Sequence, residues 1–213
     1  MKNLIIIGAR GYGREVYALA KKMREHTQCD WNIKGFLDDK ADAFAGLNGE
    51  FPPILGPVET YEIQPGDVFI CALGNGIYRR KYVEMILAKG GAFISLVDPD
   101  ARVMETAKIG KGCIVGRWTI VSDNVEIGDY TMVHSFTTFG HDAKIGKFNS
   151  IESYVFLGGG ASTGELTTMH VRSAIIPHKH VGDQVSVGFG SVVMRNFGDN
   201  VSVFGNPAKR MDF

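Results

Sequence analysis

The chain has 213 residues, enough for one or two domains of ordinary size. Its 23 lysine and arginine residues balance 23 aspartate and glutamate residues, which argues against nonspecific binding to nucleic acid or to an anionic membrane. With 45% hydrophobic residues the sequence is too apolar to be disordered, and its 27 glycines predict many turns.

The cysteines and the first residues bear on the compartment. Cys29, Cys71 and Cys113 are far apart and odd in number, which favours reduced thiols in the cytosol over a disulfide framework. The N-terminal apolar run, residues 4–7, is too short for the core of a signal peptide, and no later run is long enough to span a membrane. We therefore expect a soluble, cytoplasmic protein.

A small α/β domain with Rossmann-like βαβ connections is predicted over residues 1–98. Strands are expected over residues 4–7, 33–37, 68–73 and 93–97, and helices over residues 14–24 and 77–89. Glycine or aspartate follows three of the strands, in the sequences GARGYG (8–13), DD (38–39) and GNG (74–76). Ligands bind at the carboxyl edge of an open parallel sheet, so these turns are candidate ligand contacts.

Two of these turns have alternative interpretations. A strand, a glycine turn and a helix in succession point backbone N–H groups at a phosphate. However, the spacing is G-x-x-G-x-G and not the dinucleotide-binding G-x-G-x-x-G, so the turn is also compatible with a tight strand-to-helix connection. Asp38 and Asp39 are placed to accept hydrogen bonds from a ribose or base, or they form a solvated turn.

A six-residue repeat fills residues 99–197. In the series that takes every sixth residue from Val103 to Val193, fifteen of 16 positions are apolar, and the exception is Thr163. Glycine directly follows nine of these positions. This pattern predicts a parallel β-helix of slightly more than five coils, with three short strands in each 18-residue coil. We expect the glycines to relax the backbone at the corners, where a Cβ would strain it. Residues 198–213 are predicted to be a C-terminal exit segment.

Five segments, in this order of two domains, resemble the NeuD/PglD-like family of sugar acyltransferases, whose β-helix is left-handed and built from hexapeptide repeats. The segments are GARGYG (8–13), FLDD (36–39), ALGN (72–75), HDAKIG (141–146) and GNPAK (205–209). The resemblance covers the whole chain. It implies an acetyltransferase that uses acetyl-CoA as co-substrate and no metal. It also implies a nucleotide-linked amino sugar as acceptor, a place in surface glycan synthesis, and a homotrimer with acetyl-CoA between adjacent β-helices.

By position in the family's motifs, the resemblance assigns roles to individual residues. His141 is the expected catalytic base and Asp142 its acidic neighbour. Contacts to acetyl-CoA are expected at Ser150, Val171 and Phe189, although relatives often have a second histidine at the position of Ser150. Contacts to the nucleotide sugar are expected at Arg10, Gly11, Tyr12, Asp38, Asp39, Gly74 and Ile77.

The residue types at this site suit acetyl transfer. Histidine is free near pH 7 and still basic enough to take a proton from an attacking amine, and a neighbouring carboxylate orients the ring. Gly159 follows His141 by 18 residues and therefore stacks on it, about 4.8 Å away in the next coil. Because Gly159 has no side chain, we hypothesise that its N–H binds the thioester oxygen as negative charge develops.

A column of His134, Glu152 and His170 is also spaced by 18 residues. It is interpreted as a hydrogen-bonded corner ladder, as part of the acceptor site through His134 and a neighbouring subunit, or as a metal site. Hexapeptide carbonic anhydrases hold zinc through three histidines, the first two 36 residues apart as here. Ile175 stands where the third would be, so we reject that zinc site.

The sequence therefore predicts an acetyl-CoA-dependent N-acetyltransferase that acts on a nucleotide-linked amino sugar, with His141 as general base. The nearest alternative is O-acetylation of a sugar or of sialic acid. A third interpretation is a catalytically inactive scaffold that binds a nucleotide sugar, because Ser150 replaces a histidine that helps to hold acetyl-CoA in relatives.

Overall fold

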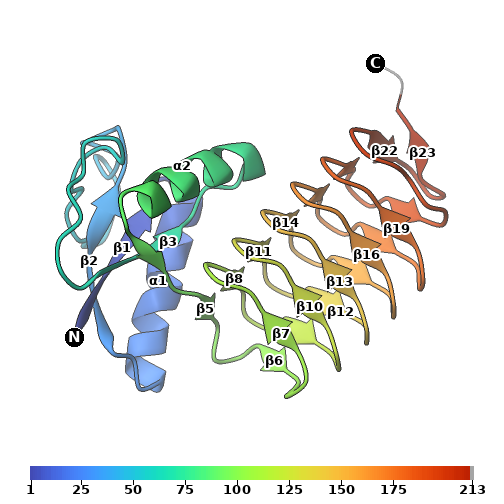
Figure 1. The fold of residues 1–213 in the computed structure, drawn as a ribbon, viewed down its shortest axis with the longest axis horizontal. Coiled ribbons are helices and arrows are strands. Elements are labelled where there is room, and N and C mark those ends of the chain that lie inside the picture. The colour runs from blue at the N-terminus through green and yellow to red at the C-terminus, as the bar shows by residue number, and fades with distance from the viewer. Residues whose placement is uncertain (212–213) are drawn as a thin grey trace.

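The N-terminal domain is a parallel sheet of four strands with a helix on each face (Figure 1). The computed structural model describes residues 1–211. The strands are β1 (Lys2–Ile7), β2 (Trp31–Leu37), β3 (Asp67–Cys71) and β4 (Ala92–Phe93), in the order β2-β1-β3-β4. Helix α1 (Gly11–His26) follows β1, and helix α2 (Gly76–Ala88) follows β3. The predicted helices and the first three predicted strands are confirmed, with bounds that differ by up to three residues.

Strand β1 is apolar on both sides because both of its faces are covered. Leu4 and Ile6 belong to the hydrophobic core that includes α1. Ile5 and Ile7, which point the other way, belong to the core that includes α2. Full burial of each such side chain contributes about 2 kcal/mol, which explains an uninterrupted apolar run where a half-exposed strand would alternate.

The strand predicted over residues 93–97 is split in two. Its first part lies in β4 and pairs with β3 of the N-terminal domain. Its second part, β5 (Leu96–Val97), pairs with β8 (Ile114–Val115) of the C-terminal half. The prediction of a single strand was therefore wrong, and the sheets of the C-terminal half begin before the domain boundary predicted at residue 98.

The C-terminal half is a parallel β-helix of three sheets. Each of the 16 positions from Val103 to Val193 is the second residue of one two-residue strand, so the six-residue period is confirmed. All of them except the first two, Val103 and Ile109, are buried. Sheet 1 contains β5, β8, β11, β14, β17, β20, β22 and β23; sheet 2 contains β6, β9, β12, β15, β18 and β21; sheet 3 contains β7, β10, β13, β16 and β19.

The bounds of the remaining strands follow the chain around these sheets. They are β6 (Arg102–Val103), β7 (Lys108–Ile109), β9 (Ile120–Val121), β10 (Glu126–Ile127), β11 (Met132–Val133), β12 (Thr138–Phe139), β13 (Lys144–Ile145), β14 (Ser150–Ile151), β15 (Phe156–Leu157), β16 (Ser162–Thr163), β17 (Thr168–Met169), β18 (Ala174–Ile175), β19 (His180–Val181), β20 (Ser186–Val187), β21 (Val192–Val193), β22 (Ser202–Phe204) and β23 (Lys209–Arg210). Strand β22 continues sheet 1 in parallel and β23 turns back on it, within the predicted exit segment. Residues 212 and 213 of that segment lie outside the described residues.

The glycines that follow the inward residues are needed for close stacking of the coils. A Cβ on Gly140 would lie 2.6 Å from the backbone nitrogen of Gly159, and one on Gly146 would overlap the carbonyl of Gly164. These glycines do not have positive φ angles, so the predicted reason, relief of backbone strain, is wrong. The left-handed position comes two residues later in each corner and is held mostly by other residue types, including Trp118, Asn124, Tyr130, Phe136 and Asp142.

The one polar residue of the inward series is satisfied by a buried neighbour. The hydroxyl of Thr163 accepts a hydrogen bond of 2.6 Å from the side-chain amide of Asn149, which is itself fully buried. Asn149 also donates to the carbonyl of Gly164 and accepts from the N–H of Thr167. A buried polar group costs little when it is hydrogen-bonded, so the repeat tolerates threonine at this position.

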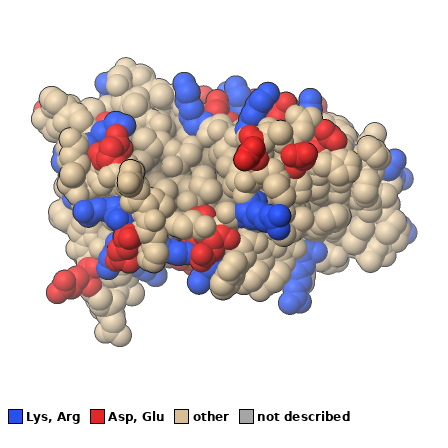
Figure 2. Space-filling view, turned by 90° about the horizontal axis from the view of Figure 1, so that it is seen from below, with Lys and Arg blue, Asp and Glu red and all other residues tan. Residues whose placement is uncertain are grey.

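The N-terminal domain packs on sheet 1 and on the two corners beside it. Ile114 of β8 and Met132 of β11 share a core with α1, and the rings of Tyr130 and Phe148, on the corner between sheets 3 and 1, share a core with α2. Figure 2 shows acidic and basic residues interspersed over the face seen there, as expected from balanced charge. Among residues 1–211, no helix has both the length and the apolarity needed to cross a membrane.

Candidate functional site

A cleft of about 410 Å³ opens at the carboxyl ends of β1, β2 and β3. Five of the residues predicted to contact a nucleotide sugar line it: Arg10, Tyr12, Asp38, Asp39 and Gly74. The other two flank it on the helices, with Gly11 exposed at the start of α1 and Ile77 exposed in the first turn of α2. The carboxyl edge of the sheet thus gathers the predicted contacts into one concave surface.

The glycine-rich turn leaves backbone N–H groups available for an anion. Gly8 has a φ of +95°, and a Cβ on Gly13 would overlap the carbonyl of Gly8, so the turn requires glycine at both positions. The residue that precedes α1, Arg10, makes no side-chain hydrogen bond to the helix, and the first turn contains no acidic residue. The start of a helix with uncapped N–H groups attracts negative charge, as in a diphosphate.

The two aspartates after β2 have different environments. The carboxylate of Asp38 accepts hydrogen bonds from the N–H of Ala9 at 2.8 Å and from the N–H of Lys40 at 3.0 Å. Asp38 therefore ties the glycine-rich turn to the end of β2. Asp39 is exposed at the rim of the cleft and is the carboxylate that is open to a ligand.

His141 and Asp142 form an exposed pair at the corner between sheets 2 and 3. The Nδ1 atom of His141 lies 2.7 Å from Oδ2 of Asp142, and the histidine side chain is 68% exposed. The other carboxylate oxygen accepts a hydrogen bond of 2.7 Å from the side-chain amide of Asn124. The hydrogen bonds from Asn124 and His141 lower the pKa of Asp142, so its carboxylate is a hydrogen-bond acceptor. Nδ1 of His141 then carries the proton, and Nε2 is left with a lone pair that can act as a base.

Gly159 lies directly against the ring of His141. A Cβ at this position would be 2.7 Å from Nε2 of the imidazole. In other coils the N–H at the equivalent turn position is bonded by an aspartate of the following coil, as Lys111 is by Asp129. The residue 18 positions after Gly159 is Pro177, whose side chain has no acceptor, so the Gly159 N–H has no such partner among the described residues.

The structure does not bring His141 and the cleft together within one chain. His141 lies between β12 of sheet 2 and β13 of sheet 3, whereas the N-terminal domain covers sheet 1 and its two flanking corners. In a three-sided prism, the corner between sheets 2 and 3 is opposite sheet 1. A reaction that uses both must therefore combine the cleft of one chain with the His141 of another.

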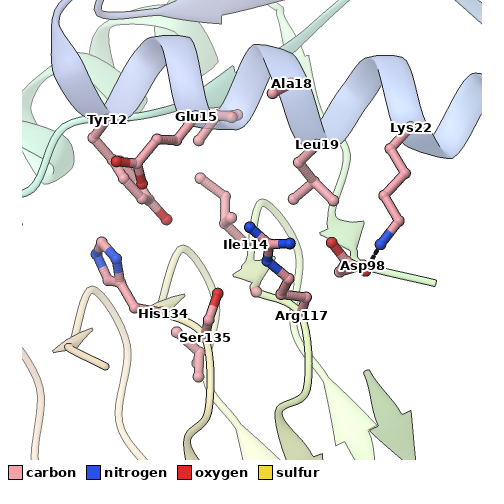
Figure 3. Close-up of a pocket in the computed structure, with 13 residues that line it drawn as sticks. Tyr12, Glu15, Ala18, Leu19, Lys22, Asp98, Ile114, Arg117, His134 and Ser135 are labelled. Atoms are coloured by element: carbon pink, nitrogen blue, oxygen red, sulfur yellow. Dashed lines mark hydrogen bonds and ion pairs between the residues drawn. The ribbon is translucent and has the colours of Figure 1, made fainter. Parts of the chain in front are cut away.

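A second hollow, of about 530 Å³, lies between α1 and the first coils of the β-helix (Figure 3). Tyr12 of α1 and His134 of the β-helix face each other at one end, with ring centroids 4.5 Å apart. Lys22 binds Asp98 at the other end, with 2.6 Å between Nζ and Oδ1. Burial lowers the pKa of His134, against opposing effects of Glu15 and Glu152. The predicted substrate residues Tyr12 and His134 are thus neighbours.

The lower part of the histidine column is a hydrogen-bonded ladder. Nδ1 of His170 lies 3.2 Å from Oε1 of Glu152, and the other carboxylate oxygen accepts from the N–H of Val171 at 2.9 Å. Nε2 of His170 is 3.2 Å from the hydroxyl of Ser186. His134 stands apart from this ladder, against Tyr12. No group of three or more metal-ligating side chains occurs among residues 1–211.

The three residues predicted to contact acetyl-CoA occupy different environments. Phe189 is 60% exposed, and Val171 is half-buried on the corner between sheets 1 and 2. Ser150, on β14 of sheet 1, is only 4% exposed and is covered by the N-terminal domain. Arg79 of α2, next to Ser150, is wholly buried and was missed by the sequence analysis. A signal was present, because Arg79 shares the i, i+4, i+7 apolar stripe of α2 with Val83 and Ile86.

Comparison with known proteins gives the same two-part organisation. Residues 3–86 match the family model of the PglD N-terminal domain. A curated relative, the UDP-N-acetylbacillosamine N-acetyltransferase of Bacillus subtilis (strain 168), is 29% identical over 116 residues. This match covers 54% of the chain and about half of the relative, 51% of its length.

Solved structures match the whole chain. The acetyltransferase domain of PglB from Neisseria gonorrhoeae FA1090 is 29% identical with a TM-score of 0.89, covering 99% of this chain and 100% of that domain. The same domain in complex with acetyl coenzyme A is 27% identical with a TM-score of 0.71, covering 99% of each chain. A mutant of perosamine N-acetyltransferase from Caulobacter crescentus, 23% identical with a TM-score of 0.78, covers 100% of this chain and 98% of its own and shares the fold.

These findings define a class, the hexapeptide-repeat acyltransferases that carry a nucleotide-type N-terminal domain. Within it, the chain belongs to the NeuD/PglD-like family of sugar acyltransferases. The predicted fold class, a small Rossmann-like domain followed by a left-handed parallel β-helix, is confirmed.

Proposed function

We propose that the protein is an acetyl-CoA-dependent N-acetyltransferase, acting on the amino group of a nucleotide-linked amino sugar for surface glycan synthesis. The observation that carries the proposal is the exposed pair of His141 and Asp142 beside Gly159, in a chain that also has a cleft suited to a nucleotide. Two relatives support the substrates. The PglB domain binds acetyl coenzyme A, and the Bacillus subtilis relative is named for N-acetylation of a UDP-linked sugar.

In the proposed reaction His141 is the general base. The amine nitrogen of the sugar attacks the thioester carbon, and Nε2 of His141 takes the proton that the nitrogen loses. The C–N bond forms, the C–S bond breaks, and the proton passes to the sulfur, so that CoA leaves as a thiol. Asp142 holds the ring through Nδ1 and stabilises the imidazolium. The N–H of Gly159 donates to the developing oxyanion, a contact worth about 3 kcal/mol in other enzymes.

The cleft of the N-terminal domain is proposed to hold the nucleotide. The uncapped start of α1, with Arg10 and Gly11, suits the diphosphate. Asp39 is open to a ribose or base, with Gly74 and Ile77 on the opposite side of the cleft. Tyr12 and His134 lie between the cleft and the β-helix, where they can contact the sugar. Asp38 acts indirectly, by holding the turn.

A second copy of the chain is proposed to complete the site, in a homotrimer with acetyl-CoA between adjacent β-helices. The separation of His141 from the cleft of its own chain supports this assembly. An exposed column of stacked rings on the corner between sheets 1 and 2 also supports it: the centroids of Trp118 and Phe136, and those of Phe136 and Tyr154, are 4.7 Å apart. Val171 and Phe189 are the cofactor contacts that such an interface would cover.

The test measures release of CoA with a panel of nucleotide-linked amino sugars. Wild-type protein is expected to release CoA with at least one of them, and the kcat of His141→Ala is expected to fall about 10²- to 10⁴-fold. Release that is unaffected by this substitution would remove His141 as the base. Acetylation of a hydroxyl instead of an amine would favour the sugar O-acetyltransferase, and no release with any acceptor would favour an inactive scaffold.

A further inference from the structure

Arg79 is a buried cation that binds only neutral groups. Its side chain is fully buried in α2, and no carboxylate of the described residues forms an ion pair with it. On the side of the N-terminal domain, Nη1 donates to the carbonyl of Leu73 at 2.6 Å and to that of Gly74 at 3.2 Å. These two residues belong to the turn between β3 and α2, which forms one wall of the nucleotide cleft.

The remaining donors of Arg79 reach the β-helix. Nε donates to the carbonyl of Tyr130 at 2.8 Å. Nη2 donates to the carbonyls of Phe148 at 2.6 Å and Asn149 at 2.8 Å. All the N–H directions of the guanidinium are therefore used, and one planar group connects two corners of the β-helix with the wall of the cleft.

Ser150 closes the same connection from the β-helix. Its hydroxyl donates to the carbonyl of Gly74 at 2.6 Å and accepts from Nη2 of Arg79 at 3.2 Å. The Gly74 carbonyl thus receives one donor from each domain. The contact is also tight, because a Cβ on Gly76 would lie 2.6 Å from the carbonyl of Phe148. On its other side the turn packs against the glycine-rich turn, since a Cβ on Gly8 would lie 2.8 Å from Leu73.

An unpaired buried charge is a poor way to stabilise a fold. Desolvation of a guanidinium is costly even when every N–H is bonded, and an apolar residue would fill the same stripe of α2 at lower cost. What the arginine adds is geometry, because five directed donors in one plane allow one arrangement of the carbonyls around them. The residues at the wall of the cleft are the ones that this geometry fixes.

We propose that Arg79 and Ser150 are positioning residues that clamp the turn of residues 73–75 in its nucleotide-binding geometry, so that nucleotide affinity depends on contact with the β-helix. The inference deepens the proposed function and rests on it for the identity of the ligand. It also gives Ser150 a role that differs from the contact with acetyl-CoA implied by the family resemblance, and the two roles predict different kinetics.

The first experiment compares Ser150→Ala with Ser173→Ala. Ser173 is an equally buried serine of the β-helix whose hydroxyl has no hydrogen-bond partner, so its replacement controls for loss of a buried hydroxyl alone. Ser150→Ala is expected to raise the KM for the nucleotide sugar about 3- to 10-fold while kcat and the KM for acetyl-CoA stay within about twofold, because one hydrogen bond is lost at the cleft. A change confined to the KM for acetyl-CoA would overturn the clamp, and so would no change in either constant.

A second measurement needs no substrate. Hydrogen exchange of the backbone amides of residues 74–77 is expected to be about tenfold faster in Ser150→Ala than in wild type and unchanged in Ser173→Ala. Exchange that is equal in all three proteins would overturn the clamp. Because this readout is independent of any ligand, it separates failure of the clamp from failure of the proposed function, which would show as an absence of CoA release in wild type.

Arg79 is tested by Arg79→Lys, which keeps the charge and loses the fork of donors. The variant is expected to bind UDP or GDP, whichever binds to wild type in calorimetry, at least tenfold more weakly than Ser150→Ala does. Affinity equal to that of wild type would overturn the role of Arg79. If Arg79→Lys does not fold, the Ser150→Ala comparison and the exchange measurement decide the proposal.

Discussion

The imidazole of His141 lies directly over Gly159, so the size of that residue decides where the ring can stand. Gly159→Ala would put a methyl group 2.7 Å from Nε2, and the exposed ring can escape only by rotating away from its bond to Asp142. We expect kcat to fall about 10- to 100-fold with little change in melting temperature, because the displaced ring moves into solvent. Steady-state kinetics and thermal unfolding of the same sample check this.

Gly198→Ala is the matched control for Gly159→Ala. A Cβ at Gly198 meets no atom within 4 Å, and this glycine does not have a positive φ. Its kcat should equal that of wild type. An active Gly159→Ala enzyme would show that the ring does not need its observed position for catalysis.

His134 is a residue whose charge state affects stability. Burial beside Tyr12 lowers its pKa, and Arg79 acts in the same direction, whereas Glu15 and Glu152 act to raise it. Because the unfolded chain then binds more protons than the folded one, the free energy of unfolding decreases as the pH falls through the ordinary histidine pKa of about 6.5. At higher pH the ring is neutral in both states and contributes no pH dependence.

The prediction for His134→Gln follows from this sign. Between pH 7.5 and 5.5 the melting temperature of the variant should fall less than that of wild type. Thermal unfolding at the two pH values measures the difference, with His180→Gln, an exposed histidine on β19, as control. A wild-type and a His134→Gln protein with the same pH dependence would contradict it.

At the scale of the coil, glycine is required by the approach of neighbouring backbones. A Cβ on Gly146 would overlap the carbonyl of Gly164 in the next coil, and neither backbone can move without separating sheet strands. We expect Gly146→Ala to lower the free energy of unfolding by about 1–3 kcal/mol, the usual cost of overpacking. Urea unfolding followed by circular dichroism measures the loss.

Gly198→Ala serves as the control here as well, because it adds the same methyl group without a steric contact. Its unfolding free energy should lie within about 0.5 kcal/mol of wild type. If Gly146→Ala were as stable as this control, close stacking would not be the reason for glycine at the corners.

The regular part of the fold could be predicted because each six residues repeat the same inward contact. Every strand from β6 to β21 follows from one period, since a residue at any other phase would face solvent or a corner. The split between β4 and β5 could not be predicted in this way. Phe93 and Leu96 are both apolar and only three residues apart, and the sheet that each joins depends on how the two domains pack.

The candidate site shows the same division between local and distant contacts. The pair of His141 and Asp142 is adjacent in sequence, and Gly159 follows by one coil, so both relations could be predicted from spacing. The partner of Ser150 is Gly74, 76 residues away on the other domain. No periodicity relates these two residues, and only the packing of α2 on the β-helix brings them into contact.

On the scale of the whole molecule, the separation of His141 from the cleft predicts that inactive variants rescue each other. His141→Ala keeps an intact cleft, and Arg10→Glu, which puts negative charge beside the uncapped start of α1, keeps an intact His141. In randomly mixed trimers about a quarter of the interfaces would combine an intact cleft with an intact His141. Denaturing, mixing and refolding the two variants should therefore restore up to about a quarter of wild-type CoA release.

The control for this experiment is each variant refolded alone, which should remain inactive. Activity that does not rise on mixing, in samples where mass spectrometry shows mixed oligomers, would mean that each chain carries a complete site of its own.

The three-strand coil also sets which changes of length this chain can absorb. Deleting 18 residues from the β-helix between the N-terminal domain and His141 would remove one full circuit and carry the imidazole about 4.8 Å along the axis with its bearing unchanged. Deleting six would swing everything beyond the cut round by one side of the triangle, so that His141 would emerge on a different edge. Insertions and deletions that preserve the chemistry should therefore come in whole circuits.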